Sequence, residues 1–100
     1  MAHRLAPEAE ADLDELWYYV ASNSSVETAD RLVDSITARF FLLGTHPYAG
    51  RRRDDLRPGV RAFPVGAHVL LYRVEGHDVR IQRVVRGSRD LEALPEAKVD

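Results

Sequence analysis

The spacing of apolar residues changes along this chain of 100 residues, and that change most constrains its fold. Up to about residue 43 they recur at helical spacing, whereas from residue 60 they alternate or form short runs, as in strands. This pattern predicts helices over residues 7–21 and 25–43 and strands over residues 60–65, 68–74 and 79–85.

Local signals set the helix boundaries. Pro7 suits the first position of a helix, and Ser24 followed by Glu27 has the spacing of a capping box for the second helix. Gly44 is expected to end that helix. Residues 45–59 contain two prolines and two glycines and are predicted to be a loop.

The predicted fold class is α+β, as one domain covering residues 1–100. An antiparallel helical hairpin packs on one face of a small antiparallel sheet, in the order (β)ααβββ. The bracketed strand is His3–Leu5, which is very short for a strand. The side chains expected to be largely buried are Leu13, Trp17, Leu32, Ile36, Phe40, Leu70 and Tyr72.

The strand over residues 68–74 is apolar on both alternate sets of positions, which is typical of a central strand covered on both faces. One helical layer covers only one face. The second face is therefore covered either by the loop and the acidic tail of the chain or by a partner. Pro64 predicts that its own strand lies at an edge or ends there.

Composition narrows the class of protein. The chain has no cysteine, which excludes a disulfide framework and thiolate zinc sites. It has no apolar run of about 18 residues that could span a membrane, and its N-terminus does not resemble a signal peptide. We therefore expect a cytoplasmic protein without a membrane partner.

Charge is distributed unevenly along the chain. Residues 1–50 carry a net charge of −5, residues 51–89 carry +6, and residues 90–100 carry −3. The arginines of the basic segment predict a surface for an anionic ligand or an acidic partner. Pairing of these charges within the fold is the alternative, and both interpretations stay open at this point.

Residues for catalysis are sparse. The four histidines, His3, His46, His68 and His77, lack the spacing of metal ligands, and we expect neither metal nor cofactor. Clustered arginines could stabilise the charge that develops in phosphodiester cleavage, but no general base is evident. Tyr72 is expected in the core, and Asp54 and Asp55 are expected to pair with arginines.

Several short pieces, in this order and spacing, are similar to a known family. They are Leu5-Ala6-Pro7-Glu8-Ala9, Asp12-Leu13, Trp17, Pro47, Gly50-Arg51, Leu56-Arg57-Pro58-Gly59-Val60-Arg61, Val65-Gly66, Leu71-Tyr72-Arg73 and Arg83-Val84-Val85-Arg86-Gly87-Ser88-Arg89-Asp90. Together they resemble the ParE toxins of bacterial type II toxin–antitoxin modules, within the RelE/ParE superfamily.

The resemblance implies a toxin that acts by binding and is not an enzyme. It implies a ParD-type antitoxin whose C-terminal segment wraps the toxin, operator DNA contacted only through that antitoxin, and DNA gyrase as the target. The alternative is a RelE-like, ribosome-dependent mRNA endoribonuclease. That branch has a basic residue where this chain has Val69, and a Tyr or His that is missing here after Arg89. A third interpretation is a module that has lost toxicity and only co-represses its operon.

Two sets of residues are predicted to make these contacts. The antitoxin is expected to contact Arg61, Val69, Leu71, Arg73 and Arg83. The surface responsible for toxicity is expected to contain Arg80, Arg83, Arg86 and Arg89. If strand alternation holds through Val85, Arg80 and Arg86 share one face. The alternative for Arg89 is that it pairs with Asp90 and only fixes the end of the strand.

Overall fold

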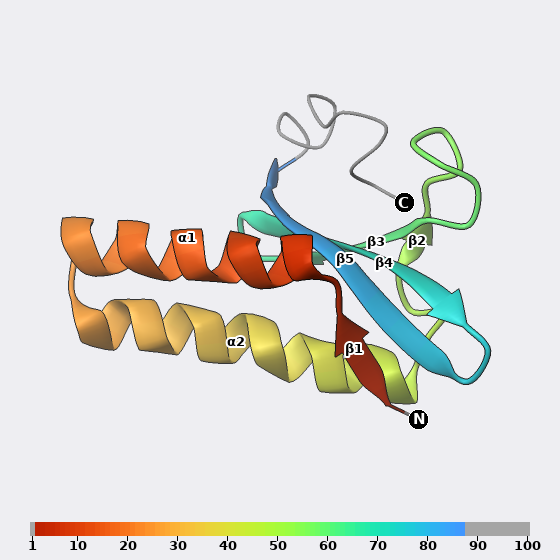
Figure 1. The fold of residues 1–100 in the computed structure, drawn as a ribbon, viewed down its shortest axis with the longest axis horizontal. Helices are drawn as coiled ribbons and strands as arrows, with labels where there is room; N and C mark the ends of the chain where they lie inside the picture. Colours follow the sequence, from red (N-terminus) through yellow and green to blue (C-terminus); the bar gives the residue numbers. More distant parts are fainter. Residues whose placement is uncertain (1, 88–100) are drawn as a thin grey trace.

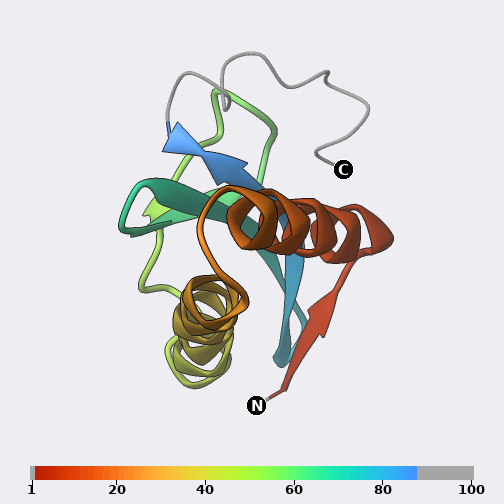
Figure 2. The same ribbon diagram turned by 90° about the vertical axis from the view of Figure 1, so that its left-hand side faces the viewer.

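The protein is described by a computed structural model, in which residues 2–87 are placed. Its elements, in chain order, are β1 (His3–Leu5), α1 (Pro7–Asn23), α2 (Val26–Thr45), β2 (Arg51–Arg52), β3 (Arg61–Val65), β4 (His68–Glu75) and β5 (Asp78–Arg86). The two helices form a hairpin on one face of a sheet with the strand order β1-β5-β4-β3-β2 (Figures 1 and 2). This arrangement confirms the predicted α+β class and the order of the elements.

The helix boundaries differ slightly from the prediction. The second helix is capped by Ser25 and not by Ser24, because the Ser25 hydroxyl oxygen accepts a hydrogen bond of 3.1 Å from the amide of Thr28. Gly44 does not end this helix, which continues to Thr45 with Gly44 buried. A glycine weakens a helix by about 1 kcal/mol, which favourable packing can offset.

The three predicted strands pair antiparallel, as expected, but the sheet as a whole is mixed. The short strand β1 runs parallel to β5, with His3 opposite Val79 and Leu5 opposite Ile81. A second short strand, β2, lies inside the segment predicted to be a loop and pairs with the start of β3. Both strands have only two or three residues, too few for an alternating pattern to reveal them.

The main core lies between the helices and the sheet. Ile36, Phe40, Leu70 and Tyr72 are buried there as predicted, whereas Leu13 and Leu32 are half-buried at its edge. Trp17 is half-buried as well, and its Nε1 donates to Asp30 at 2.8 Å. Trp17 therefore joins the two helices to each other and does not belong to the core cluster.

A β-bulge at Gln82 changes the direction of side chains along β5. Leu71 is opposite Arg83 and Tyr72 is opposite Ile81, so Gln82 is an extra residue on β5. Before the bulge Ile81 packs toward the helices, and after it Val84 does so while Val85 packs on the other face. The expectation that alternation holds through Val85 is therefore wrong.

A second, smaller core covers the sheet face that points away from the helices. It contains Val60, Ala62, Leu71 and Val85, and the loop residue Leu56 packs against it. This confirms that the loop before β3 covers part of this face; the tail lies outside the described residues. Within residues 2–87, no helix is both long and apolar enough to cross a membrane.

Candidate functional site: a groove and a loop braced by arginines

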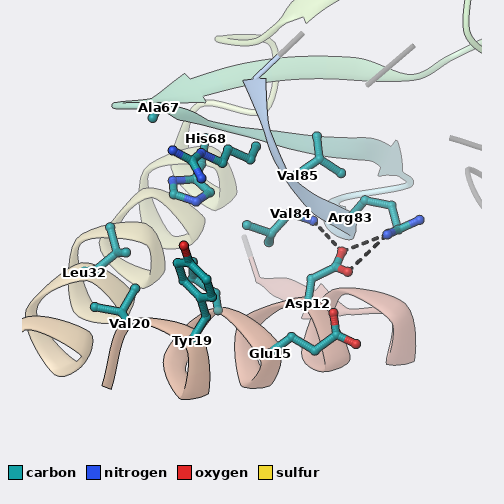
Figure 3. Close-up of a pocket in the computed structure, with 12 residues that line it drawn as sticks. Asp12, Glu15, Tyr19, Val20, Leu32, Ala67, His68, Arg83, Val84 and Val85 are labelled. Carbon is teal, nitrogen blue, oxygen red and sulfur yellow. Dashed lines mark hydrogen bonds and ion pairs between the residues drawn. The ribbon is translucent and has the colours of Figure 1, made fainter. Parts of the chain in front are cut away.

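A groove lies between the helical hairpin and the far end of β5, and we call it the α1–β5 groove (Figure 3). Its volume is about 680 Å³. The residues that line it are Asp12, Glu15, Leu16, Tyr19, Val20, Leu32, Ala67, His68, Arg83, Val84, Val85 and Arg86. Apolar side chains and groups of both charges thus meet in one open hollow, a combination suited to binding part of another protein.

An ion pair at one side of the groove joins helix α1 to strand β5. The Asp12 carboxylate accepts two hydrogen bonds from Arg83, of 2.8 and 3.1 Å, and one of 2.9 Å from the amide of Val84. Both charged side chains are mostly buried, with exposed fractions of 15% for Arg83 and 14% for Asp12. The hydrogen bonds to Asp12 raise the pKa of the Arg83 guanidinium above its already high ordinary value.

The position of this pair follows from the shortness of β1. That strand stops pairing at Ile81, so the next part of β5 has no strand on its outer edge among the described residues. Helix α1 follows β1 directly and brings Asp12 to this edge. There the carboxylate accepts the hydrogen bond from the amide of Val84 that the carbonyl of a neighbouring strand would otherwise accept.

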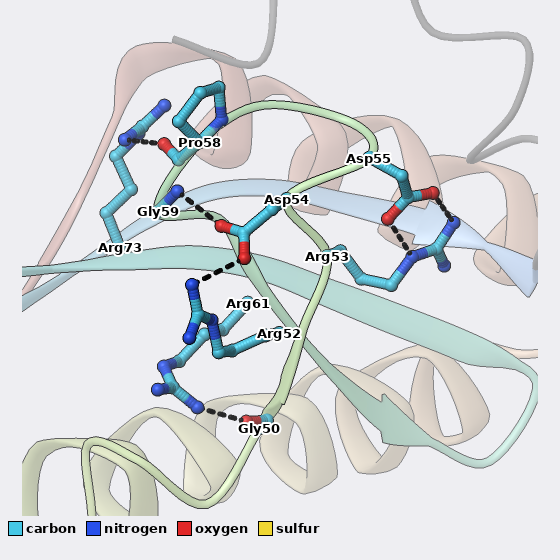
Figure 4. Close-up of polar contacts among 9 residues, drawn as sticks. All are labelled: Gly50, Arg52, Arg53, Asp54, Asp55, Pro58, Gly59, Arg61 and Arg73. Carbon is cyan, nitrogen blue, oxygen red and sulfur yellow. Dashed lines mark hydrogen bonds and ion pairs between the residues drawn. The ribbon is translucent and has the colours of Figure 1, made fainter.

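Four of the arginines hold the loop between α2 and β3 in place (Figure 4). Arg53 binds Asp55 through two hydrogen bonds of 2.9 and 2.8 Å, and Arg52 binds Asp54 at 2.7 Å. The other contacts are made to backbone carbonyls, from Arg61 to Gly50 at 2.8 Å and from Arg73 to Pro58 at 2.7 Å. For these four arginines, the structure therefore shows contacts within the fold, which was the second of the two interpretations left open by the sequence.

The two carboxylates in this loop are held in their charged form. The amide of Gly59 donates to Asp54 at 2.9 Å and is the largest cause of a lowered pKa at that carboxyl, with Arg52 also contributing. The hydrogen bond from Arg53 is the largest cause of the lowered pKa of Asp55. This confirms the expectation that both acids are partners of arginines.

Tyr72 holds the turn that follows α2 against the sheet through two hydrogen bonds. Its hydroxyl donates to the carbonyl of Pro47 and accepts from the amide of Gly50, both at 2.8 Å. A Cβ atom at Gly50 would lie 2.5 Å from that hydroxyl oxygen, so only glycine fits there without movement. Tyr72 is fully buried, and burial raises the pKa of its hydroxyl, which confirms its assignment to the core.

Replacing Tyr72 with phenylalanine is expected to lower the free energy of unfolding by about 1–3 kcal/mol, because the buried amide of Gly50 and the part-buried carbonyl of Pro47 lose their partner. Urea unfolding followed by circular dichroism measures this loss. The matched control is Tyr48→Phe, since the Tyr48 side chain is 68% exposed. Equal stability of the two variants would contradict a structural role for the Tyr72 hydroxyl.

The predicted antitoxin contacts do not lie on one surface. Arg61 is in register with Tyr72 and so lies on the helix side of the sheet, whereas Arg73 lies on the other face. Val69 is half-buried and Leu71 is fully buried in the second core. Arg83 is bound to Asp12, as described above.

The predicted toxicity residues are also divided. Arg80 is opposite Arg73 on β4, and Arg4 on β1 is opposite Arg80, so these three arginines form a row on the face away from the helices. Arg86 is opposite His68, is exposed, and lines the α1–β5 groove. The bulge therefore separates Arg80 from Arg86, and Arg89 lies outside the described residues.

Sequence reasoning did not find the groove. Its lining comes from α1, α2, the β3–β4 turn, the start of β4 and β5, and no local pattern marks residues that meet only in the folded chain. The weak signal in the sequence is Tyr19, a large aromatic residue within the predicted first helix; in the structure it is 61% exposed. Within residues 2–87, no group of three or more His, Asp or Glu side chains could hold a metal ion.

The fold is that of a small α+β protein made of a helical hairpin and a mixed sheet. Residues 4–91 match the family model described as the ParE toxin of type II toxin–antitoxin system, parDE. The chain therefore belongs to the ParE toxin family.

Individual relatives agree with this membership. The chain is 40% identical to Toxin ParE3 of Caulobacter vibrioides over 82 residues, which is 82% of each chain. It is 36% identical to Toxin ParE1 of the same organism, covering 91% of this chain and 94% of the relative. A solved structure titled "Chromosomal ParDE TA system from P. aeruginosa" superposes with a TM-score of 0.77 at 26% identity, covering 87% of this chain and 96% of the other.

Proposed function

We propose that this chain is the toxin of a type II toxin–antitoxin module, that it is neutralised by a ParD-type antitoxin, and that it inhibits growth by binding DNA gyrase. Membership of the ParE family and the likeness to a solved ParDE system support this proposal. The structural observation that carries it is the α1–β5 groove, an open hollow of about 680 Å³ with an apolar lining and charged sides.

The antitoxin is proposed to contact the sheet face that points away from the helices. There Arg4, Arg80 and Arg73 form a row across three neighbouring strands, and strands are spaced about 4.8 Å apart. An acidic segment that folds on binding could pair with this row and cover the half-buried Val69. Arg61 and Arg83 are assigned a supporting role, because each holds a neighbouring segment in place.

The target is proposed to contact Arg86 at the end of β5. Arg89, which lies outside the described residues, is proposed to contact the target as well. Arg86 is exposed at the α1–β5 groove, and no described residue forms an ion pair with it. Its exposed position at the groove supports a contact with an acidic partner, and a charge pair that forms across an interface can be worth several kcal/mol.

The alternative, a RelE-like endoribonuclease, is less well supported. Such an enzyme needs a general base close to the scissile phosphate. Tyr72 is the aromatic hydroxyl of the basic segment, and its oxygen is fully buried and already bonded to Pro47 and Gly50. The arginines could bind a phosphate, but Tyr72 is not placed to take its proton.

The proposal is tested by inducing the chain in bacteria with and without a cognate ParD-type antitoxin. We expect growth arrest with a DNA damage response when the toxin is alone, and recovery when the antitoxin is present. The purified toxin should inhibit supercoiling by gyrase. Primer extension on translated mRNA is the parallel measurement, and codon-linked cuts with unaffected supercoiling would support the ribonuclease alternative instead. Full growth with only operon repression would show that toxicity has been lost.

A further inference from the structure

A second hollow lies beside the turn that follows α2, and neither the antitoxin nor the target contact proposed above uses it. Its volume is about 430 Å³, and it is lined by Tyr48, Arg52, Gly59, Arg61, Val74 and Gly76. We call it the Tyr48 pocket. Its size is in the range of pockets that hold small ligands, and two of its six lining residues are arginines.

The two arginines are neighbours on one face of the sheet. Arg52 on β2 is directly opposite Arg61 on β3, so their Cβ atoms are expected to be about 5 Å apart. Two like charges in this position repel each other unless an anion lies close to both. Figure 4 shows the side chains next to each other, with Asp54 bound to Arg52.

Asp54 lies close to both arginines. Beyond the hydrogen bond from Gly59, the charges of Arg52 and Arg61 both lower the pKa of this carboxyl, but a single carboxylate neutralises only one of the two charges. It binds one nitrogen of Arg52 and the amide of Gly59, while the Arg52 side chain stays 71% exposed. Arg61 uses one nitrogen for the carbonyl of Gly50. Since each guanidinium carries five N–H donors, both arginines retain donors for an external anion in a position that these bonds fix.

The aromatic ring of Tyr48 lies next to the guanidinium of Arg61. The guanidinium carbon of Arg61 lies 5.0 Å from the centre of the Tyr48 ring, a cation–π contact, yet the Tyr48 side chain is 68% exposed. Arginine next to an exposed aromatic ring is the pairing with which proteins bind nucleotides, the ring stacking on the base and the cation holding the phosphate.

We propose that the Tyr48 pocket binds a nucleotide, either free or as one unit of a single-stranded nucleic acid. The phosphate lies between Arg52 and Arg61, and the base stacks on Tyr48. An acidic peptide would use the two arginines but would have no need of the ring, which is why the exposed ring favours a nucleotide. The proposal concerns binding only and is independent of the antitoxin and gyrase contacts.

The test measures binding to the purified full-length chain. Fluorescence anisotropy is recorded with labelled octamers of uridylate and of thymidylate, and calorimetry is performed with uridine monophosphate and with inorganic phosphate. Arg52→Ala and Tyr48→Ala are compared with Arg31→Ala, which removes the same charge from an exposed position near the start of α2. Thermal unfolding confirms that each variant is folded.

We expect Arg52→Ala and Tyr48→Ala each to weaken binding about tenfold or more, because one removes a phosphate contact and the other the stacking surface. Arg31→Ala should bind like the unaltered chain. Binding of the monophosphate would identify free nucleotides as ligands, and binding of the octamers alone would identify a strand; either supports the proposal. It is overturned if the unaltered chain binds none of these probes, if Arg31→Ala causes the same loss, or if Tyr48→Ala causes none.

Discussion

Replacing Asp12 with alanine is expected to lower the free energy of unfolding by about 3–5 kcal/mol, as is found when one partner of a buried ion pair is removed. The substitution leaves Arg83 mostly buried without its counter-ion and the amide of Val84 without its acceptor. A domain of this size is stable by only about 5–15 kcal/mol, so the variant would be close to unfolding. Urea unfolding followed by circular dichroism measures the difference.

Asp14 provides the matched control, because it is an exposed acid on the same helix with no ion pair to any described residue. Asp14→Ala should change the stability by less than about 0.5 kcal/mol. If Asp12→Ala proves as mild as this control, the contact between α1 and β5 does not contribute as we infer.

Replacing Arg86 with alanine is expected to abolish growth inhibition while antitoxin binding persists. Removing a charged contact at the centre of an interface commonly weakens binding by about 2 kcal/mol or more, which is roughly thirtyfold in affinity. Because Arg86 is exposed and makes no ion pair with a described residue, the variant should stay folded. Growth after induction and inhibition of gyrase by the purified variant are the two measurements.

The control for Arg86 is Arg80, which lies on the opposite face of the same strand. Arg80→Ala should leave inhibition unchanged and weaken antitoxin binding. A fully toxic Arg86→Ala protein would refute the assignment of Arg86 to the target contact. Loss of toxicity in both variants would show that the bulge does not separate the two contacts.

The sequence predicts the larger elements of this fold because their signals are local. Two helices and three antiparallel strands follow from the spacing of apolar residues within each segment. The strand β1 is recognisable only as a possibility, because its three residues are held by pairing with Ile81 and its neighbours, far away in the chain. The bulge at Gln82 is likewise set by the partner strand, and no residue type marks it in advance.

The candidate site is harder to predict, because its contacts join distant segments. Asp12 and Arg83 are separated by 71 positions, and no local pattern of charge or spacing identifies Asp12 rather than Asp14 as the partner of Arg83. The opposite net charges of the two chain segments are consistent with such a pair but do not identify its members. The close approach of Gly50 to Tyr72 is similarly visible only once the turn has folded onto β4.

The single extra residue at Gln82 has a consequence for how this toxin could diversify. It directs Arg80 and Arg86, six positions apart, to opposite sides of one strand. If the antitoxin binds one side and the target the other, as proposed above, substitutions that alter the choice of antitoxin need not disturb the side proposed to recognise the target. Caulobacter vibrioides carries at least two ParE toxins related to this chain. Modules that coexist in one cell could in this way become insulated from each other's antitoxins while keeping a common target.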